Sequence, residues 1–365
     1  MPDVVQSATQ PAPAAIAESP SGYEVTAPPP AQPEPTALED GASIRSGPEA
    51  AAGRDGEPRS VRSGPTLATE LGAVVRILWS VSLFRLRKRE MANFAGAVSV
   101  MLALGLSWRD GLWRAIAAAG MNLLVYLNND YLDLPADLAS PTRAGAETSF
   151  LAAHRRAALI AHALLSLGLL VVGVVAGWGV LLSIVVAVAA AFLYSARGKR
   201  VPFADLVLIA TGATGLGMVA APIDSPLGWC LALQLGLAAA CFQAIQSLRD
   251  LREDESFGIR TTAVRLGVDR TVRLARVIVL VNALFGACAL HRWWGIGLAA
   301  AAVLPCRRDR IDRFWNQVRL VFGVGWLLIV ASTMMRGRSW GWLLQVAATD
   351  RIEWLSALAK GPIAQ

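Results

Sequence analysis

The feature that most constrains the fold of this chain is a series of long apolar segments between residues 91 and 335. A membrane-spanning helix needs about 20 mostly apolar residues, and nine segments approach that length. They lie at residues 91–107, 112–129, 157–175, 177–194, 204–222, 227–246, 275–290, 292–305 and 317–335. Apolar residues make up 55% of the 365-residue chain and charged residues 17%, a composition too apolar for an ordinary soluble protein. The sequence therefore predicts an all-α polytopic membrane protein with about nine transmembrane helices.

The regions outside these spans have a different composition. Residues 1–65 contain 12 of the 19 prolines and few bulky apolar residues, which predicts a disordered tail. Residues 66–90 are amphipathic and then basic, so we expect them to lie in the membrane interface. On a helix begun by Thr66, one face would carry Leu71, Val74, Val75, Leu78 and Trp79. The membrane domain would then occupy residues 91–335, with a C-terminal tail at 336–365.

Basic residues indicate how the predicted spans are oriented. Lys and Arg gather in five segments, at residues 85–89, 143–156, 197–200, 249–273 and 307–313. Nine spans with a cytoplasmic N-terminus put all five on the cytoplasmic face, as expected for a multi-pass protein of the cell's inner membrane. The net charge of +7 is thus assigned to cytoplasmic loops, with a lipid bilayer and no nucleic acid as partner.

Two acidic clusters follow predicted spans on that same face. The first has the pattern N-D-x-x-D-x-x-x-D, and the second has the pattern D-x-x-x-D, at Asp250 and Asp254. Residues four apart lie on nearly the same side of a helix, so Asn129, Asp133 and Asp137 form one stripe and the second pair forms another. Two such stripes facing each other would surround a cavity with four carboxylates and an amide.

The residue types in the clusters favour a hard dication. Carboxylates this close together resist ionising at the same time, and Mg²⁺ relieves their repulsion with oxygen ligands from protein and phosphate. His and Cys are absent nearby, which disfavours zinc. The alternative is that both clusters are solvated helix ends. Pro135 is expected to kink or end the helix that carries the first cluster, which would move Asp137 off the stripe.

The paired motifs resemble those of the UbiA superfamily of intramembrane prenyltransferases. The matching residues are Asn129–Asp137 and Asp250–Asp254, and the segment Gly258–Gly267 is also similar. The resemblance implies nine helices around a central cavity that opens sideways to lipid. It also implies that Mg²⁺ joins the motifs to an allylic (poly)prenyl diphosphate, whose departure leaves a carbocation for a lipophilic, aromatic acceptor. The implied metal ligands are Asn129, Asp130, Asp133, Asp137, Asp250 and Asp254. The implied catalytic residues are Asp133, Asp137, Asp250 and Asp254.

The resemblance also implies basic and phenolic partners for the diphosphate. Family members carry Tyr-x-x-x-Lys after the fourth helix. Here Tyr194 is followed by Lys199 and Arg200, so the spacing is longer by one residue. Arg85 before the first span and Arg143 after the first motif complete the expected set. Arg143 is followed by Ala144 rather than the proline common in the family, which leaves the class of acceptor open.

A CDP-alcohol phosphotransferase and an ion transporter are the alternatives to a prenyltransferase. A CDP-alcohol phosphotransferase needs a denser continuous acidic pattern that this chain lacks. A transporter that binds ions through intramembrane carboxylates would carry them in mid-span, and no Asp or Glu lies in the middle of the third to ninth predicted spans. Within the family, Arg249–Thr261 resembles naphthoate prenyltransferases of quinone biosynthesis. The residues Ala244, Ile245 and Gln246, which precede the second motif, resemble the corresponding segment of the hydroxybenzoate prenyltransferases.

Overall fold

A computed structural model describes residues 67–87, 91–140 and 144–337, and in these residues all regular structure is helical. The longer helices are α1 (Leu67–Arg87), α2 (Ala92–Ala103), α3 (Trp108–Ala139), α5 (Arg155–Ala176), α6 (Trp178–Ala196), α7 (Ala204–Val219), α8 (Pro226–Arg249), α11 (Val268–Phe285) and α13 (Ile311–Gly337). Shorter elements connect them: α4 (Ala146–Ala153), η1 (Gly198–Arg200), α9 (Leu251–Ser256), α10 (Thr262–Leu266), η2 (Gly286–Leu290), α12 (Arg292–Leu298) and η3 (Ala299–Val303). Predictions for residues 1–65 and for the capping residue Thr66 lie outside the described residues.

Short polar residues and a glycine set several helix ends. Ser107 begins α3, and its Oγ accepts a hydrogen bond from the backbone N–H of Asp110 at 3.2 Å. Ser225 begins α8 in the same way, with Pro226 in the first helical position, where its missing N–H costs nothing. Gly177 has a φ of 105° and separates α5 from α6. The segments 157–175 and 177–194 are therefore two helices, as predicted.

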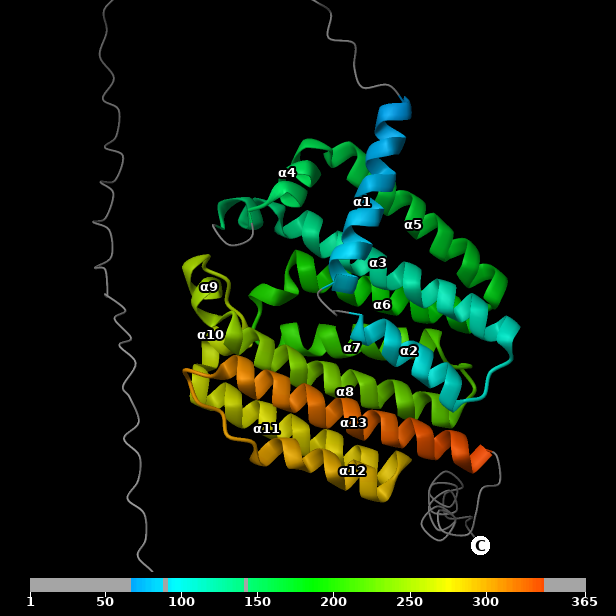
Figure 1. Ribbon diagram of the computed structural model, residues 1–365, viewed down its shortest axis with the longest axis vertical. Coiled ribbons are helices and arrows are strands. Elements are labelled where there is room, and N and C mark those ends of the chain that lie inside the picture. The colour runs from blue at the N-terminus through cyan, green and yellow to red at the C-terminus, as the bar shows by residue number, and fades with distance from the viewer. Residues whose placement is uncertain (1–66, 88–90, 141–143, 338–365) are drawn as a thin grey trace, which may run out of the picture. The chain divides into compact units, whose positions relative to one another are not determined.

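Small residues allow α6, α7 and α8 to pack closely, side by side, as seen in Figure 1. A Cβ atom added to Gly215 of α7 would lie 2.7 Å from the Cβ of Ala187 in α6. One added to Gly217 would lie 2.8 Å from the Cα of Ala232 in α8. Because lipid tails are as apolar as the side chains, such close contact is what holds helices together in a bilayer. These three closely packed helices support the polar end of the molecule.

Helix α1 packs against α3 and α5 through one side. Val74 and Ile77 are buried against those helices, whereas Leu71, Val75 and Trp79 are 49%, 67% and 68% exposed. Most of the predicted apolar face thus points outward, and Val74 at its edge joins the core. That residues 66–90 lie in the membrane interface stays a prediction.

Five described helices are long and apolar enough to cross a membrane: Arg155–Ala176, Trp178–Ala196, Pro226–Arg249, Val268–Leu290 and Ile311–Arg336. Two shorter apolar helices, α2 and α7, coincide with the first and fifth predicted spans. The predicted span 292–305 is a seven-residue α-helix followed by a five-residue 3₁₀ helix. Nine full spans therefore stay a prediction.

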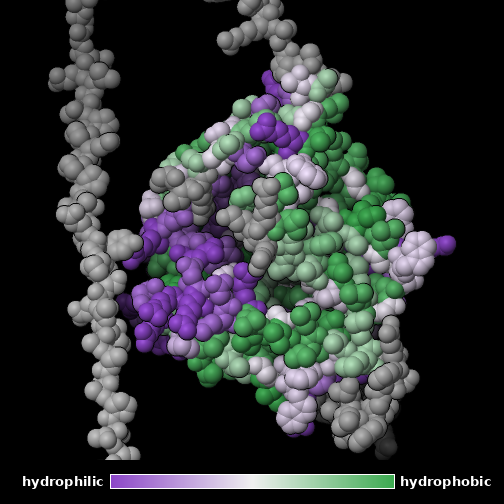
Figure 2. All heavy atoms as spheres, viewed as in Figure 1, coloured by the Kyte–Doolittle hydropathy of each residue, from purple (hydrophilic) through white to green (hydrophobic). Residues whose placement is uncertain are grey.

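The hydropathy of the surface is divided between two regions. Figure 2 shows hydrophilic residues gathered around a hollow at the side where α9 and α10 lie, and mostly hydrophobic residues elsewhere on that face. Large apolar side chains such as Leu167, Val171 and Val174 of α5 are more than half exposed. An outward apolar surface with one polar end is typical of a helical protein embedded in a bilayer.

Candidate active site

The first acidic motif lies on the last turns of α3. This helix continues to Ala139 with Pro135 inside it, so of the two expectations for Pro135, a kink or a helix end, the helix end is wrong. Leu134, the neighbour of Pro135, is 1% exposed. Packing of this turn against α1 and α4 compensates for the backbone hydrogen bond that the proline cannot make. Asp137 consequently stays on the same helix as Asp133.

The second acidic motif lies where α8 ends. Asp250 is the residue between α8 and α9, and Asp254 lies one turn later in α9. The backbone N–H of Asp254 donates to the carbonyl of Asp250 at 2.9 Å, so the two residues are held in a helical turn. Ser140, just after α3, donates to Glu253 at 3.4 Å. The two motif-bearing segments are thus in direct contact.

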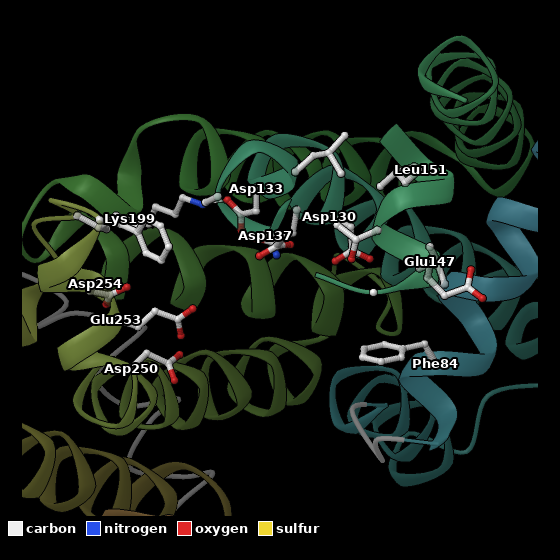
Figure 3. Close-up of a pocket in the computed structure, with 18 of the residues that line it drawn as sticks. Phe84, Asp130, Asp133, Asp137, Glu147, Leu151, Lys199, Asp250, Glu253 and Asp254 are labelled. Carbon is white, nitrogen blue, oxygen red and sulfur yellow. Dashed lines mark ion pairs between the residues drawn. The ribbon is translucent and has the colours of Figure 1, made fainter. Parts of the chain in front are cut away.

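Both motifs line one open pocket of about 840 Å³. Its carboxylates belong to three parts of the chain and are those of Asp130, Asp133, Asp137, Glu147, Asp250, Glu253 and Asp254. Figure 3 shows the side chains of Asp133 and Asp137 on one side of the pocket and those of Asp250 and Glu253 opposite. The geometry expected from the two stripes, an acidic cavity between the motifs, is present in these described residues.

Lys199 supplies positive charge to this acidic pocket. It lies in η1, the turn after α6, and its ammonium forms an ion pair with Asp133. The side chain is only 13% exposed. Burial and the neighbouring Arg200 together lower the pKa of Lys199 to about 8, against the opposing effect of Asp254. The amine is therefore held between the two motifs, where it can meet an anionic ligand.

Uncharged polar residues complete the inner side of the pocket. Gln243 of α8 donates from Nε2 to the hydroxyl of Tyr194 at 3.1 Å and to that of Ser247 at 3.2 Å. Ser195 donates to Oδ1 of Asn129 at 3.5 Å. Asn129 and Tyr194, both predicted from sequence, are thus fixed by neighbours on other helices.

The remaining predicted diphosphate ligands have different positions. Arg200 is exposed and does not line the pocket. The side chain of Arg85 and the whole of Arg143 lie outside the described residues.

Several pocket residues were not predicted. Gln243 and Ser247 precede Asp250 by seven and three residues on α8, so helical periodicity back from the second motif could have identified them. Glu147 lies on the short helix α4, and Phe84 lies on α1. No sequence pattern links these two residues to the motifs, because only the fold of α1 and α4 over the end of α3 brings them there.

The chemistry of the pocket fits a hard cation shared with a ligand. Among the described residues, no three His, Cys, Asp or Glu side chains are close enough together to hold a metal ion by themselves. Mg²⁺ is commonly held by one or two carboxylates and completed by phosphate oxygens and water. Oxygen donors on both sides of a pocket of this size match that requirement, and its lining, as far as the structure describes it, contains neither His nor Cys.

Lys199 and Arg200 are adjacent basic residues. Substituting each in turn tests which side chain contributes positive charge to the pocket. We expect Lys199→Gln to weaken the binding of inorganic diphosphate about tenfold or more, because a buried charge-assisted contact is lost. The matched variant Arg200→Gln removes the same charge one residue away, from an exposed side chain, and should change this affinity little. Titration calorimetry in detergent measures both. Equal effects would show that the pocket responds only to net charge.

Helices with an apolar outer surface and a carboxylate-lined pocket at one end are typical of a polytopic membrane protein with a polar binding site. A sequence profile of the UbiA prenyltransferase family matches residues 92–307, more than half of the chain. The chain belongs to this family of intramembrane prenyltransferases. No curated protein matches the sequence.

Solved structures of similar fold agree with the family. One is a digeranylgeranylglyceryl phosphate synthase, with a TM-score of 0.56 and 13% identity, covering 73% of this chain and 99% of that one. Another is a UbiA homologue from Archaeoglobus fulgidus bound to GPP and Mg²⁺, with a TM-score of 0.51 and 15% identity, covering 71% of this chain and 99% of that one. At such identities the likeness shows the fold alone.

Proposed function

We propose that this chain transfers a (poly)prenyl group from an allylic diphosphate to a lipophilic, aromatic acceptor of the kind used in quinone biosynthesis. The observation that carries the proposal is the single pocket lined by both acidic motifs and Lys199. The motifs are more than a hundred residues apart in the sequence. Binding of one metal–diphosphate complex by both motifs would explain why they line the same pocket. The GPP and Mg²⁺ of the Archaeoglobus fulgidus homologue support the class of donor.

In this proposal the polar side of the pocket binds the diphosphate. Mg²⁺, when bound, would neutralise charge on the departing diphosphate, and its ligands would come from Asn129, Asp130, Asp133, Asp137, Asp250 and Asp254. Lys199 would bind the diphosphate oxygens directly, in a buried setting where its charge counts more than in water. Tyr194, held by Gln243, can donate its hydroxyl proton to another oxygen. Arg85 and Arg143 stay candidates for the same role.

The apolar side of the pocket would hold the prenyl chain and exclude water. It is lined by Ile77, Val81 and Phe84 of α1 and by Phe150 and Leu151 of α4. In the reaction the allylic C–O bond breaks, and the diphosphate departs with the electron pair. A carbon of the aromatic ring forms the new C–C bond and then loses its proton. Apolar walls protect the intermediate cation from water.

Product analysis tests the proposed reaction. Membranes containing the protein would be incubated with Mg²⁺, labelled allylic diphosphates of several chain lengths and a panel of aromatic acids, with products identified by mass. We expect a prenylated aromatic product that the matching host membranes do not make. Transfer only to a glyceryl phosphate acceptor would contradict the aromatic assignment. No transfer from any diphosphate, with the metal-dependent transport of an ion instead, would favour a transporter.

The proposed orientation places both acidic motifs and the N-terminus on the cytoplasmic face of the inner membrane. Ala144→Cys and Ser256→Cys replace exposed residues close to the two motifs, in a background whose four native cysteines are changed to alanine. We expect an impermeant thiol reagent to label both only from the cytoplasmic side. Arg109→Cys, at the opposite end of α3, should be labelled only from outside. Labelling of either motif position in intact cells would contradict this orientation.

A further inference from the structure

We infer that Asp205 and Thr262 are positioning residues that hold the Lys199 turn against the segment following the second acidic motif, and thereby shape the diphosphate site. This inference rests on the proposed function. Asp205 is the second residue of α7, and Thr262 is the first residue of α10. Both are completely buried, and neither belongs to an acidic motif.

The contacts of Asp205 account for both of its carboxylate oxygens. Oδ2 accepts the backbone N–H of Thr262 at 3.0 Å. Oδ1 accepts the hydroxyl of Thr262 and also the backbone N–H of Leu206, the latter at 3.0 Å. Among the described residues, no Lys or Arg forms an ion pair with Asp205. A buried carboxylate is costly unless its hydrogen bonds are satisfied, so this carboxylate depends on Thr262.

Thr262 extends the contact to the turn that carries Lys199. Its Oγ1 accepts the backbone N–H of Phe203 at 2.7 Å. Phe203 has a φ of 67°, a left-handed conformation that is uncommon for a bulky residue and persists only where its surroundings hold it. The hydroxyl of Thr262 therefore joins α7 to the turn between η1 and α7. Loss of this hydroxyl would release that turn, and Lys199 with it.

The other end of the contact leads to the second motif. Thr261, next to Thr262, lines the acidic pocket. The backbone N–H of Ile259 donates to the carbonyl of Asp254 at 2.8 Å, so the segment from Asp254 to Thr262 is short and tied back on itself. Lys199 and Asp254, on two segments far apart in sequence, are thus held in place through one buried side-chain pair. A change in that pair would therefore alter the affinity for a diphosphate that contacts both Lys199 and Asp254.

Thr262→Val tests the inference, because valine keeps the shape of threonine and lacks its hydroxyl. The matched control is Thr271→Val. Thr271 is equally buried, and its hydroxyl donates to the carbonyl of Gly267 at 2.9 Å, away from the pocket. Thr262→Val should lose more thermal stability than Thr271→Val, because it leaves a buried carboxylate oxygen and the backbone N–H of Phe203 without their partner. Only Thr262→Val should raise the KM for the donor diphosphate, on the order of tenfold, without a matching change in the KM for the acceptor. Thr262→Ser should restore the wild-type KM.

Two further measurements keep the result decisive. Binding of geranyl thiodiphosphate with Mg²⁺, a non-reactive analogue, should weaken in Thr262→Val and not in Thr271→Val. If Thr262→Val does not fold, Asp205→Asn replaces it, since its amide group would face a donor of Thr262. A wild type without prenyl transfer would contradict the proposed function. An active wild type, with the same donor KM and analogue affinity in the Thr262 or Asp205 variant as in Thr271→Val, would overturn the inference.

Discussion

Asp133→Asn and Asp254→Asn are each expected to lower the kcat of prenyl transfer about 10³-fold, equivalent to roughly 4 kcal/mol of transition-state stabilisation. The two carboxylates lie on opposite motifs and line the same pocket. Asparagine keeps the shape of each side chain and removes the negative charge that a cation needs. The fold should survive, because loss of one charge from a crowded acidic cluster relieves repulsion. Turnover with a fixed donor, acceptor and Mg²⁺ concentration measures the effect.

A matched control separates a local effect from a general loss of charge. Asp269 is 70% exposed, pairs with Arg308 and does not line the pocket. Asp269→Asn should therefore retain activity close to that of the wild type, since exposed ion pairs contribute little. If either pocket variant turned over as fast as Asp269→Asn, the assignment of these carboxylates to the reaction would be wrong.

The arrangement of the acidic motifs could be predicted because the features that set it are local. Spacings of four residues place Asn129, Asp133 and Asp137 on one side of a helix, and the basic loops predict that both motifs share one face of the membrane. The two motifs are far apart in the sequence, and their meeting at one site was predicted from the family resemblance. Electrostatic repulsion among the carboxylates, which a shared cation would relieve, supported the same prediction. The pocket between α3 and the α8–α9 junction agrees with this reasoning.

Other features depend on tertiary packing and could not be derived from local patterns. Pro135 stays inside α3 because neighbouring helices hold its turn, so the local rule that proline ends a helix failed there. The division of α1 into an inward and an outward side depends on where α3 and α5 lie. The pair formed by Asp205 and Thr262 joins residues 57 positions apart, and neither belongs to a recognisable motif.

The central claim is that the two motifs act on one metal–diphosphate complex, and a double-mutant cycle of Asp133→Asn and Asp250→Asn tests it most directly. Residues that act as a unit have strongly non-additive effects on rate, whereas independent and distant sites are close to additive. Local helix effects cannot join residues on α3 and at the end of α8, so coupling must pass through direct contact or a shared ligand.

The measurement is kcat for the wild type, both single variants and the double variant, at equal protein concentration and saturating Mg²⁺, with a parallel series in EDTA. If each single variant loses about 10³-fold, the account predicts that the double variant is no slower than the slower single variant. It also predicts that EDTA reduces all four to the same residual rate. Multiplication of the two single losses in the double variant, or full wild-type activity in EDTA, would contradict the shared metal–diphosphate site.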